Sequence, residues 1–174
     1  MQHHDIEIQL NRGRADLIEA FAALDEAERI RPVTRSEHDP SAMWSAQDHM
    51  VHVAHFEQTL AEIVRRYAAG HPKPMGPIFG DDGARRGRDE IMANLNRTNE
   101  EFVLAHRGHS FHQAVALGQA ARAETLALAG GLTQDQLDAK IAGSPFGDGT
   151  VAAALAASAD HGRMHLKWLD EARA

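Results

Sequence analysis

Apolar side chains recur every three or four residues along most of this 174-residue chain. That spacing places them on one face of an α-helix. In one segment the apolar series runs Val53, Phe56, Leu60 and Ile63. No segment shows a sustained alternation of β-branched apolar and polar residues, the pattern that indicates a β-strand. The sequence therefore predicts an all-α fold without a sheet.

The helical segments have recognisable ends. Ser45, Ser110 and Thr133 each precede an Asp or Gln by three residues, which is the spacing of a capping box at a helix N-terminus. Long helices are expected over about residues 5–29, 45–69, 89–105, 110–129 and 151–172, and a short one after Thr133. A chain of this length usually forms one domain. We expect residues 1–174 to form a four-helix bundle with an extra short helix.

Two polar connections are long for a compact domain, Arg31–Met43 and Gly70–Arg88. The second contains three of the six prolines. Loops of this length are either lids and rims of a functional site or plain solvated connections, and both interpretations stay open.

Composition excludes several classes of function. The chain has no cysteine, which rules out disulfides, zinc ribbons, iron–sulfur clusters and cysteine catalysis. Its formal net charge of -7 argues against nucleic acid and anionic membranes as partners. The polar N-terminus resembles no signal peptide, and no stretch is apolar enough to span a membrane. We therefore expect a cytoplasmic protein.

Three of the 12 histidines share the apolar faces of two helices. His161 and His165 are four residues apart, so they lie on one face of the last helix. His52 precedes Phe56 by one turn on the face of another helix. Buried imidazoles need partners, and one divalent metal ion satisfies all three. Three ligands with one open position is typical of a catalytic metal site.

Other interpretations of the histidines remain. His49 and His55 flank His52, and either one is a rim residue or a fourth ligand that would close the site. The three histidines of the triad could instead be ordinary core residues of a helical interaction module. A further group of histidines lies around Arg107–Gly108, where the helical pattern is interrupted, and it could bind metal or form a solvated corner. These histidines are His106, His109 and His112.

Two segments resemble the DinB-like (YfiT-like) family of metalloenzymes. In Trp44–Glu57, a histidine follows the tryptophan by eight residues, as the family's metal ligand does, and this is His52. Asp160–Leu166 is similar to the family's final H-x-x-x-H-L helix. The stretch from Asn94 through Leu137 also resembles the family's third helix and its L-[ST]-x-x-x-L ending, and it looks closest to the branch that contains the colibactin self-resistance cyclopropane hydrolase.

The resemblance implies a four-helix bundle with His52, His161 and His165 as ligands of a divalent metal. Zinc, nickel, manganese and iron are not distinguished. It further implies a hydrolase or a thiol-dependent S-transferase that acts on a small molecule. The alternative is a non-catalytic protein of the same fold that is stabilised by metal and binds or sequesters a compound. A homodimer is expected from the fold alone.

No catalytic side chain is identified from the sequence. Asp48 is either a general base or the acid of the capping box, and Glu57 is expected on a flank of its helix. Arg163 is expected at the surface. Because the chain has no cysteine, any low-molecular-weight thiol must come from a separate cofactor, for which Arg85–Arg88 is a candidate rim. Hydrolysis is preferred, since water is always present.

Overall fold

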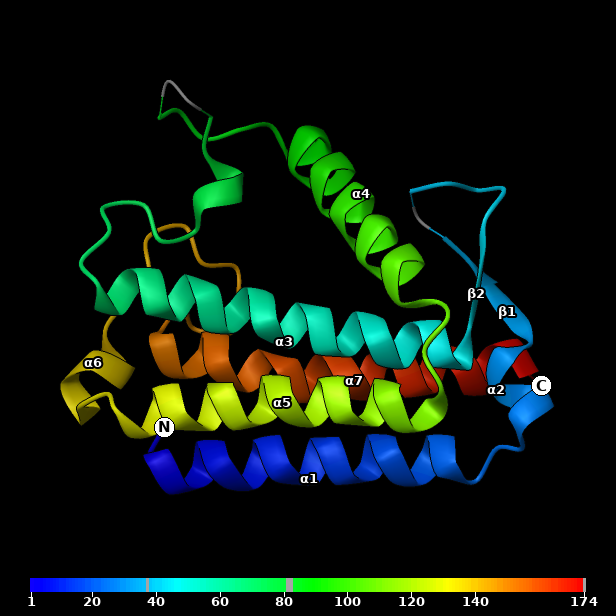
Figure 1. Cartoon of the computed structure of the whole chain (residues 1–174). Helices are drawn as coiled ribbons and strands as arrows, with labels where there is room; N and C mark the ends of the chain where they lie inside the picture. Colours follow the sequence, from blue (N-terminus) through cyan, green and yellow to red (C-terminus); the bar gives the residue numbers. More distant parts are fainter. Residues whose placement is uncertain (37, 81–82, 174) are drawn as a thin grey trace.

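The computed structural model describes residues 1–36, 38–80 and 83–173 and confirms the all-α fold class (Figure 1). Four long helices lie side by side. Both α1 and α3 pack against α5 and α7. A fifth long helix, α4, contacts α3 and projects away from the bundle (Figure 1). The five helices are α1 (His3–Ala22), α3 (Ala46–Ala68), α4 (Arg88–His106), α5 (Phe111–Gly130) and α7 (Val151–Arg173).

The first helix is shorter than the apolar periodicity predicts. It ends at Ala22, and a separate α2 (Glu26–Ile30) begins after Asp25, whose side chain accepts a hydrogen bond from the backbone N–H of Glu28. The periodicity continues across this break because Leu24 still packs against the core.

The connection around Arg31–Met43, for which the sequence predicts no secondary structure, contains a small sheet, so the expectation of no strand is wrong here. β1 (Pro32–Arg35) pairs antiparallel with β2 (Met43–Ser45). Strands this short carry too few alternating positions to show a pattern in the sequence. The remaining short elements are α6 (Gln134–Asp138) and the 3-10 helix η1 (Gly76–Ile78).

The predicted capping boxes are confirmed. Ser45 Oγ accepts a hydrogen bond from the backbone N–H of Asp48 at 3.2 Å, and Asp48 Oδ2 accepts one from the backbone N–H of Ser45 at 2.8 Å. Ser110 and Thr133 begin α5 and α6 in the same way. These caps fix where α3 starts, and therefore which of its residues face the neighbouring helices.

Two apolar clusters form the core. One surrounds Leu10, Leu60 and Leu155, and the other surrounds Phe21 and Met50. Between them α1 and α7 approach closely at Gly13, where an added Cβ would lie 3.1 Å from the Cβ of Ala159. None of the helices in the described part of the chain is long and apolar enough to cross a membrane.

A buried ionic cluster joins three helices of the bundle. Glu57 on α3 is fully buried, so the expectation that it lies on a flank is wrong. Its carboxylate accepts hydrogen bonds from Arg14 Nη2 at 2.6 Å and from Arg122 Nε at 2.5 Å and Nη2 at 3.1 Å. Glu57 thereby neutralises one of two guanidinium charges that the bundle takes out of water.

Candidate metal centre

Three histidines from two neighbouring helices converge in the structure. His52 comes from α3, and His161 and His165 come from α7. His161 Nε2 lies 2.9 Å from His52 Nε2 and 3.1 Å from His165 Nε2. All three candidate ligand atoms lie within 4.8 Å of one another. The structure thus brings together the three residues that the sequence singled out.

Helix geometry and aromatic packing hold these rings in place. One turn of α7 separates His161 from His165, so both face α3. Phe56 stacks on His161 with ring centroids 3.8 Å apart, and Trp44 lies 5.2 Å from the ring of His52. These contacts restrict the rotamers of the imidazoles before any ligand binds.

The buried imidazoles are neutral at physiological pH. His52 and His165 are buried, with exposed fractions of 4% and 2%. Burial lowers the pKa of His161 to about 4. Burial, with neighbouring histidines adding to it, lowers the pKa of His52 and of His165 well below the usual value. Each neutral ring therefore keeps a lone pair on one nitrogen, and neutral imidazole is the form of histidine that binds metal.

His49 contacts the far side of His165 rather than the centre of the cluster. Its Nδ1 lies 2.7 Å from His165 Nδ1, and its Nε2 lies 2.7 Å from Thr34 Oγ1 on β1. Burial lowers the pKa of His49 to about 4, so this ring is also neutral and carries one N–H. It is fully buried, and the expectation of a rim residue is wrong.

The hydrogen bonds are consistent with one placement of protons if the lone pair of His165 Nε2 points toward the converging nitrogens of His52 and His161. His165 Nδ1–H then donates to His49 Nδ1, and His49 Nε2–H donates to the hydroxyl oxygen of Thr34. A chain of this kind fixes the tautomer and ring orientation of a metal-ligating histidine. His49 therefore lies on the outer side of His165, and its two ring nitrogens contact His165 and Thr34 rather than the centre of the cluster.

His55 also lies outside the cluster. It is half-buried and stacks on Phe102 of α4 at 4.1 Å, and Phe102 in turn stacks on His106 at 4.1 Å. Burial, with a smaller effect of His106, lowers the pKa of His55. This stack joins α3 to α4. Among the described residues the converging set therefore contains three histidines.

The donor set fits a divalent transition metal. Neutral imidazole nitrogens suit zinc, nickel and iron. In a tetrahedral site with bonds of about 2.1 Å, ligand nitrogens lie about 3.4 Å apart. The separations of 2.9 and 3.1 Å are slightly shorter, so small ring movements would admit an ion. His52 Nδ1 is buried without a partner among the described residues, which leaves it free to carry the ring's proton.

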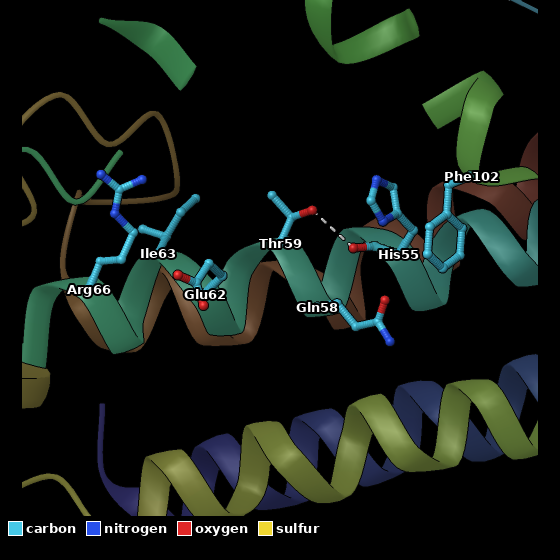
Figure 2. A pocket seen from close by; sticks show the side chains of 7 residues that line it. All are labelled: His55, Gln58, Thr59, Glu62, Ile63, Arg66 and Phe102. Atoms are coloured by element: carbon cyan, nitrogen blue, oxygen red, sulfur yellow. Dashed lines mark hydrogen bonds between the residues drawn. The ribbon is translucent and has the colours of Figure 1, made fainter. Parts of the chain in front are cut away.

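A separate surface pocket of about 330 Å³ lies along α3 and is drawn in Figure 2. Phe102 of α4 flanks it beside His55, and Arg66 lies at the other end (Figure 2). None of the three converging histidines lines it. The pocket and the histidine cluster are therefore distinct features of the molecule.

The other candidates from the sequence have structural roles. Asp48 Oδ2 accepts hydrogen bonds from the backbone and hydroxyl of Ser45, so it serves as the capping acid. Arg163 is exposed and pairs with Asp160. Arg86 pairs with Glu90.

Sequence reasoning missed Thr34 and the inward position of His49. Thr34 lies in a polar segment with no distinguishing pattern, and it reaches His49 only through the β1–β2 ribbon. His49 precedes His52 by three residues and so lies on a neighbouring part of the same face. That spacing is the one signal that could have indicated a supporting role.

Comparisons with known proteins identify the family and the fold of the chain. A family model described as the DinB superfamily matches residues 9–169. A crystal structure of an uncharacterised protein from Escherichia coli UTI89 is similar with a TM-score of 0.65 and 14% sequence identity. The match covers 98% of this chain and 91% of that one, and at this identity it shows the fold alone. No curated protein matched the chain.

Proposed function

The chain belongs to the DinB superfamily, and on that premise we propose that it is a metal-dependent enzyme acting on a small molecule. Metal binding is common in this superfamily. The ligands in this proposal are His52, His161 and His165, the residues whose nitrogens converge. When bound there, a divalent ion would supply Lewis-acid chemistry and would lower the pKa of a water molecule toward neutral pH.

One observation carries the catalytic part of the proposal. The fourth nearby histidine, His49, bonds the outer nitrogen of His165 instead of facing the centre. Three protein ligands leave a coordination position open, whereas structural sites are usually closed by four. An open position is what a water molecule or a substrate needs in order to reach the centre.

The chain's own residues supply binding, orientation and exclusion of water. His49 and Thr34 hold His165 in one tautomer. Trp44 is buried against the rings of His49 and His52 at centroid distances of 5.4 and 5.2 Å. Apolar and aromatic packing of this kind lowers the local dielectric, which strengthens electrostatic interactions inside the site.

Hydrolysis is the reaction class that we favour over thiol transfer. Water needs no dedicated binding site, and the chain has no cysteine of its own. A thiol-dependent reaction would require a separate low-molecular-weight thiol as a second substrate. The substrate in either case is a small molecule, since the net charge of -7 does not favour nucleic acid.

The experiment is an activity screen with metal-reconstituted, tag-free protein. Esters, lactones and epoxides are offered with water alone and then with added thiol, and turnover is followed by mass spectrometry. We expect turnover that is lost on chelation, restored by one divalent metal, absent in His161→Ala and retained in the exposed-site control Arg163→Ala. Turnover that survives complete metal removal would contradict the proposal. Stabilisation by metal without turnover on any substrate would favour the non-catalytic alternative.

A further inference from the structure

Trp44 connects the candidate metal centre with α4. Its indole is buried, and its Nε1–H donates a hydrogen bond of 2.8 Å to Oε2 of Glu100 on α4. The same ring lies against His52, with centroids 5.2 Å apart, and against His49 at 5.4 Å. One side chain of β2 therefore contacts a candidate metal ligand, the histidine that bonds His165, and a carboxylate from a different helix.

His52 lacks a polar partner on the nitrogen that faces away from the cluster. This nitrogen, Nδ1, is buried and makes no hydrogen bond within the part of the chain that the structure describes. Metal-binding histidines are usually oriented by a hydrogen bond at that position, and His165 has one with His49. Two ring contacts of His52 are with the other candidate ligands, His161 and His165. Among the ring contacts of the described residues, the one that restrains His52 from outside the triad is Trp44.

Glu100 fixes the orientation of this indole. The side chain of Glu100 is 4% exposed, so its hydrogen bond to Trp44 forms away from water. A buried indole N–H needs a partner, and a carboxylate oxygen is a strong acceptor. The hydroxyl of Ser36 donates to the same oxygen of Glu100, which holds the carboxylate in turn. Packing together with such bonds restricts a side chain to one rotamer.

The contact with Trp44 also lies where α4 meets the bundle. All residues of α4 are described, and two of them are buried, Glu100 and Val103. The C-terminal end of α4 lies near α3, and its N-terminal end diverges from α3 (Figure 1). Phe102 adds a stacking contact with His55 of α3. The placement of α4 therefore depends on the same region that positions Trp44.

We propose that Glu100 is a positioning residue of the metal centre, acting through the indole of Trp44 on the ring of His52. The inference rests on the metal site of the proposed function. In this role Glu100 touches neither metal nor substrate, and it acts by restricting the orientation of a ligand. Coupling between two binding events is reciprocal. Docking of α4 therefore strengthens metal binding, and bound metal stabilises the docked position of α4.

The test is the zinc and nickel affinity of full-length, tag-free protein, measured by competition with a chromophoric chelator. Glu100→Met removes the acceptor at similar volume, and we expect about tenfold weaker binding, the lower end of the range for groups that orient metal ligands. Glu100→Gln keeps an acceptor oxygen and should stay within about threefold of wild type. Glu101→Met makes the same change at the exposed neighbouring position and should bind as wild type does.

A double-mutant cycle separates a positioning role from a general loss of structure. Trp44→Phe keeps a ring and removes the N–H, so it should also weaken metal binding about tenfold. Adding Glu100→Met to Trp44→Phe should then change the affinity by less than about twofold, because the route through the indole is already lost. Independent losses that multiply to about a hundredfold would overturn the proposal. So would a Glu100→Met protein that is folded by circular dichroism and binds metal as tightly as wild type.

Hydrogen exchange of the wild-type protein tests the same coupling if a variant fails to fold. We expect saturating metal to slow amide exchange around Glu100 in α4 about tenfold, the factor that reciprocity requires, and to leave α6 unchanged. Absence of a metal-dependent change in α4 would overturn the proposal. A wild-type protein that binds neither zinc nor nickel would overturn the proposed function itself, and this inference with it.

Discussion

The buried cluster of Glu57, Arg14 and Arg122 gives a sharp test of the energetics of this fold. Glu57→Gln keeps the shape of the side chain and removes its charge. Glu57 is 0% exposed, and the two arginines are each 6% exposed. Without the carboxylate, two guanidinium charges remain in the bundle with no counter-charge among the described side chains.

The expected loss of stability is large because several arginine nitrogens of the cluster already lack hydrogen-bond partners in the described structure. Arg14 Nε, Arg14 Nη1 and Arg122 Nη1 are buried without a hydrogen-bond partner among the described residues. Removing one partner from a buried ion pair typically costs about 3–5 kcal/mol. In a domain of this size each kcal/mol lowers Tm by about 2–4 °C. We therefore expect Tm to fall by roughly 6–20 °C.

The assay is urea and thermal unfolding followed by circular dichroism. Glu62→Gln on the same helix is the matched control, because Glu62 is exposed and pairs only with surface Arg65 in the described structure. Its effect should stay within about 0.5 kcal/mol. The triple substitution Arg14→Met, Glu57→Leu and Arg122→Leu should recover most of the loss, since apolar replacement of a buried ionic cluster is often neutral or stabilising. A Glu57→Gln protein within about 1 kcal/mol of wild type would refute the reasoning.

Two further predictions concern the histidine chain and the helix crossing. His49→Ala removes the partner of His165 Nδ1, and we expect about 10–100-fold weaker metal binding in competition titrations with a chromophoric chelator. His112→Ala, at an exposed position on α5, should leave the affinity unchanged, and equal affinity in both variants would disprove the orienting role of His49. Gly13→Leu places a side chain where even a Cβ would lie 3.1 Å from Ala159. The free energy of unfolding should therefore fall by about 1–3 kcal/mol. Unchanged stability would show that α1 and α7 can move apart at no cost.

The local features of the helices could be predicted from the sequence because they depend on neighbours in the chain. Ser45 and Asp48 are three residues apart, and the side chain of each accepts a hydrogen bond from the backbone N–H of the other. His161 and His165 share a face for the same reason. The match of these predictions with the structure reflects helix capping and helix periodicity, both of which are local.

Features that depend on contacts between distant segments could not be predicted in the same way. The sequence gives no sign that α4 leaves the bundle, since its apolar residues are periodic like those of the other helices. Glu57 looks like an ordinary surface acid until Arg14 and Arg122 approach it from α1 and α5. His49 contacts Thr34 because the pairing of β1 with β2 brings the two residues together.

Metal stoichiometry tests the central claim most directly. Tag-free wild type, His161→Ala and the exposed-histidine control His112→Ala are reconstituted with zinc, nickel or manganese, desalted, and measured by elemental analysis. We expect about one metal ion per chain in wild type and control, and loss of that ion in His161→Ala. No bound metal in any of the proteins, or equal metal content in wild type and His161→Ala, would contradict it.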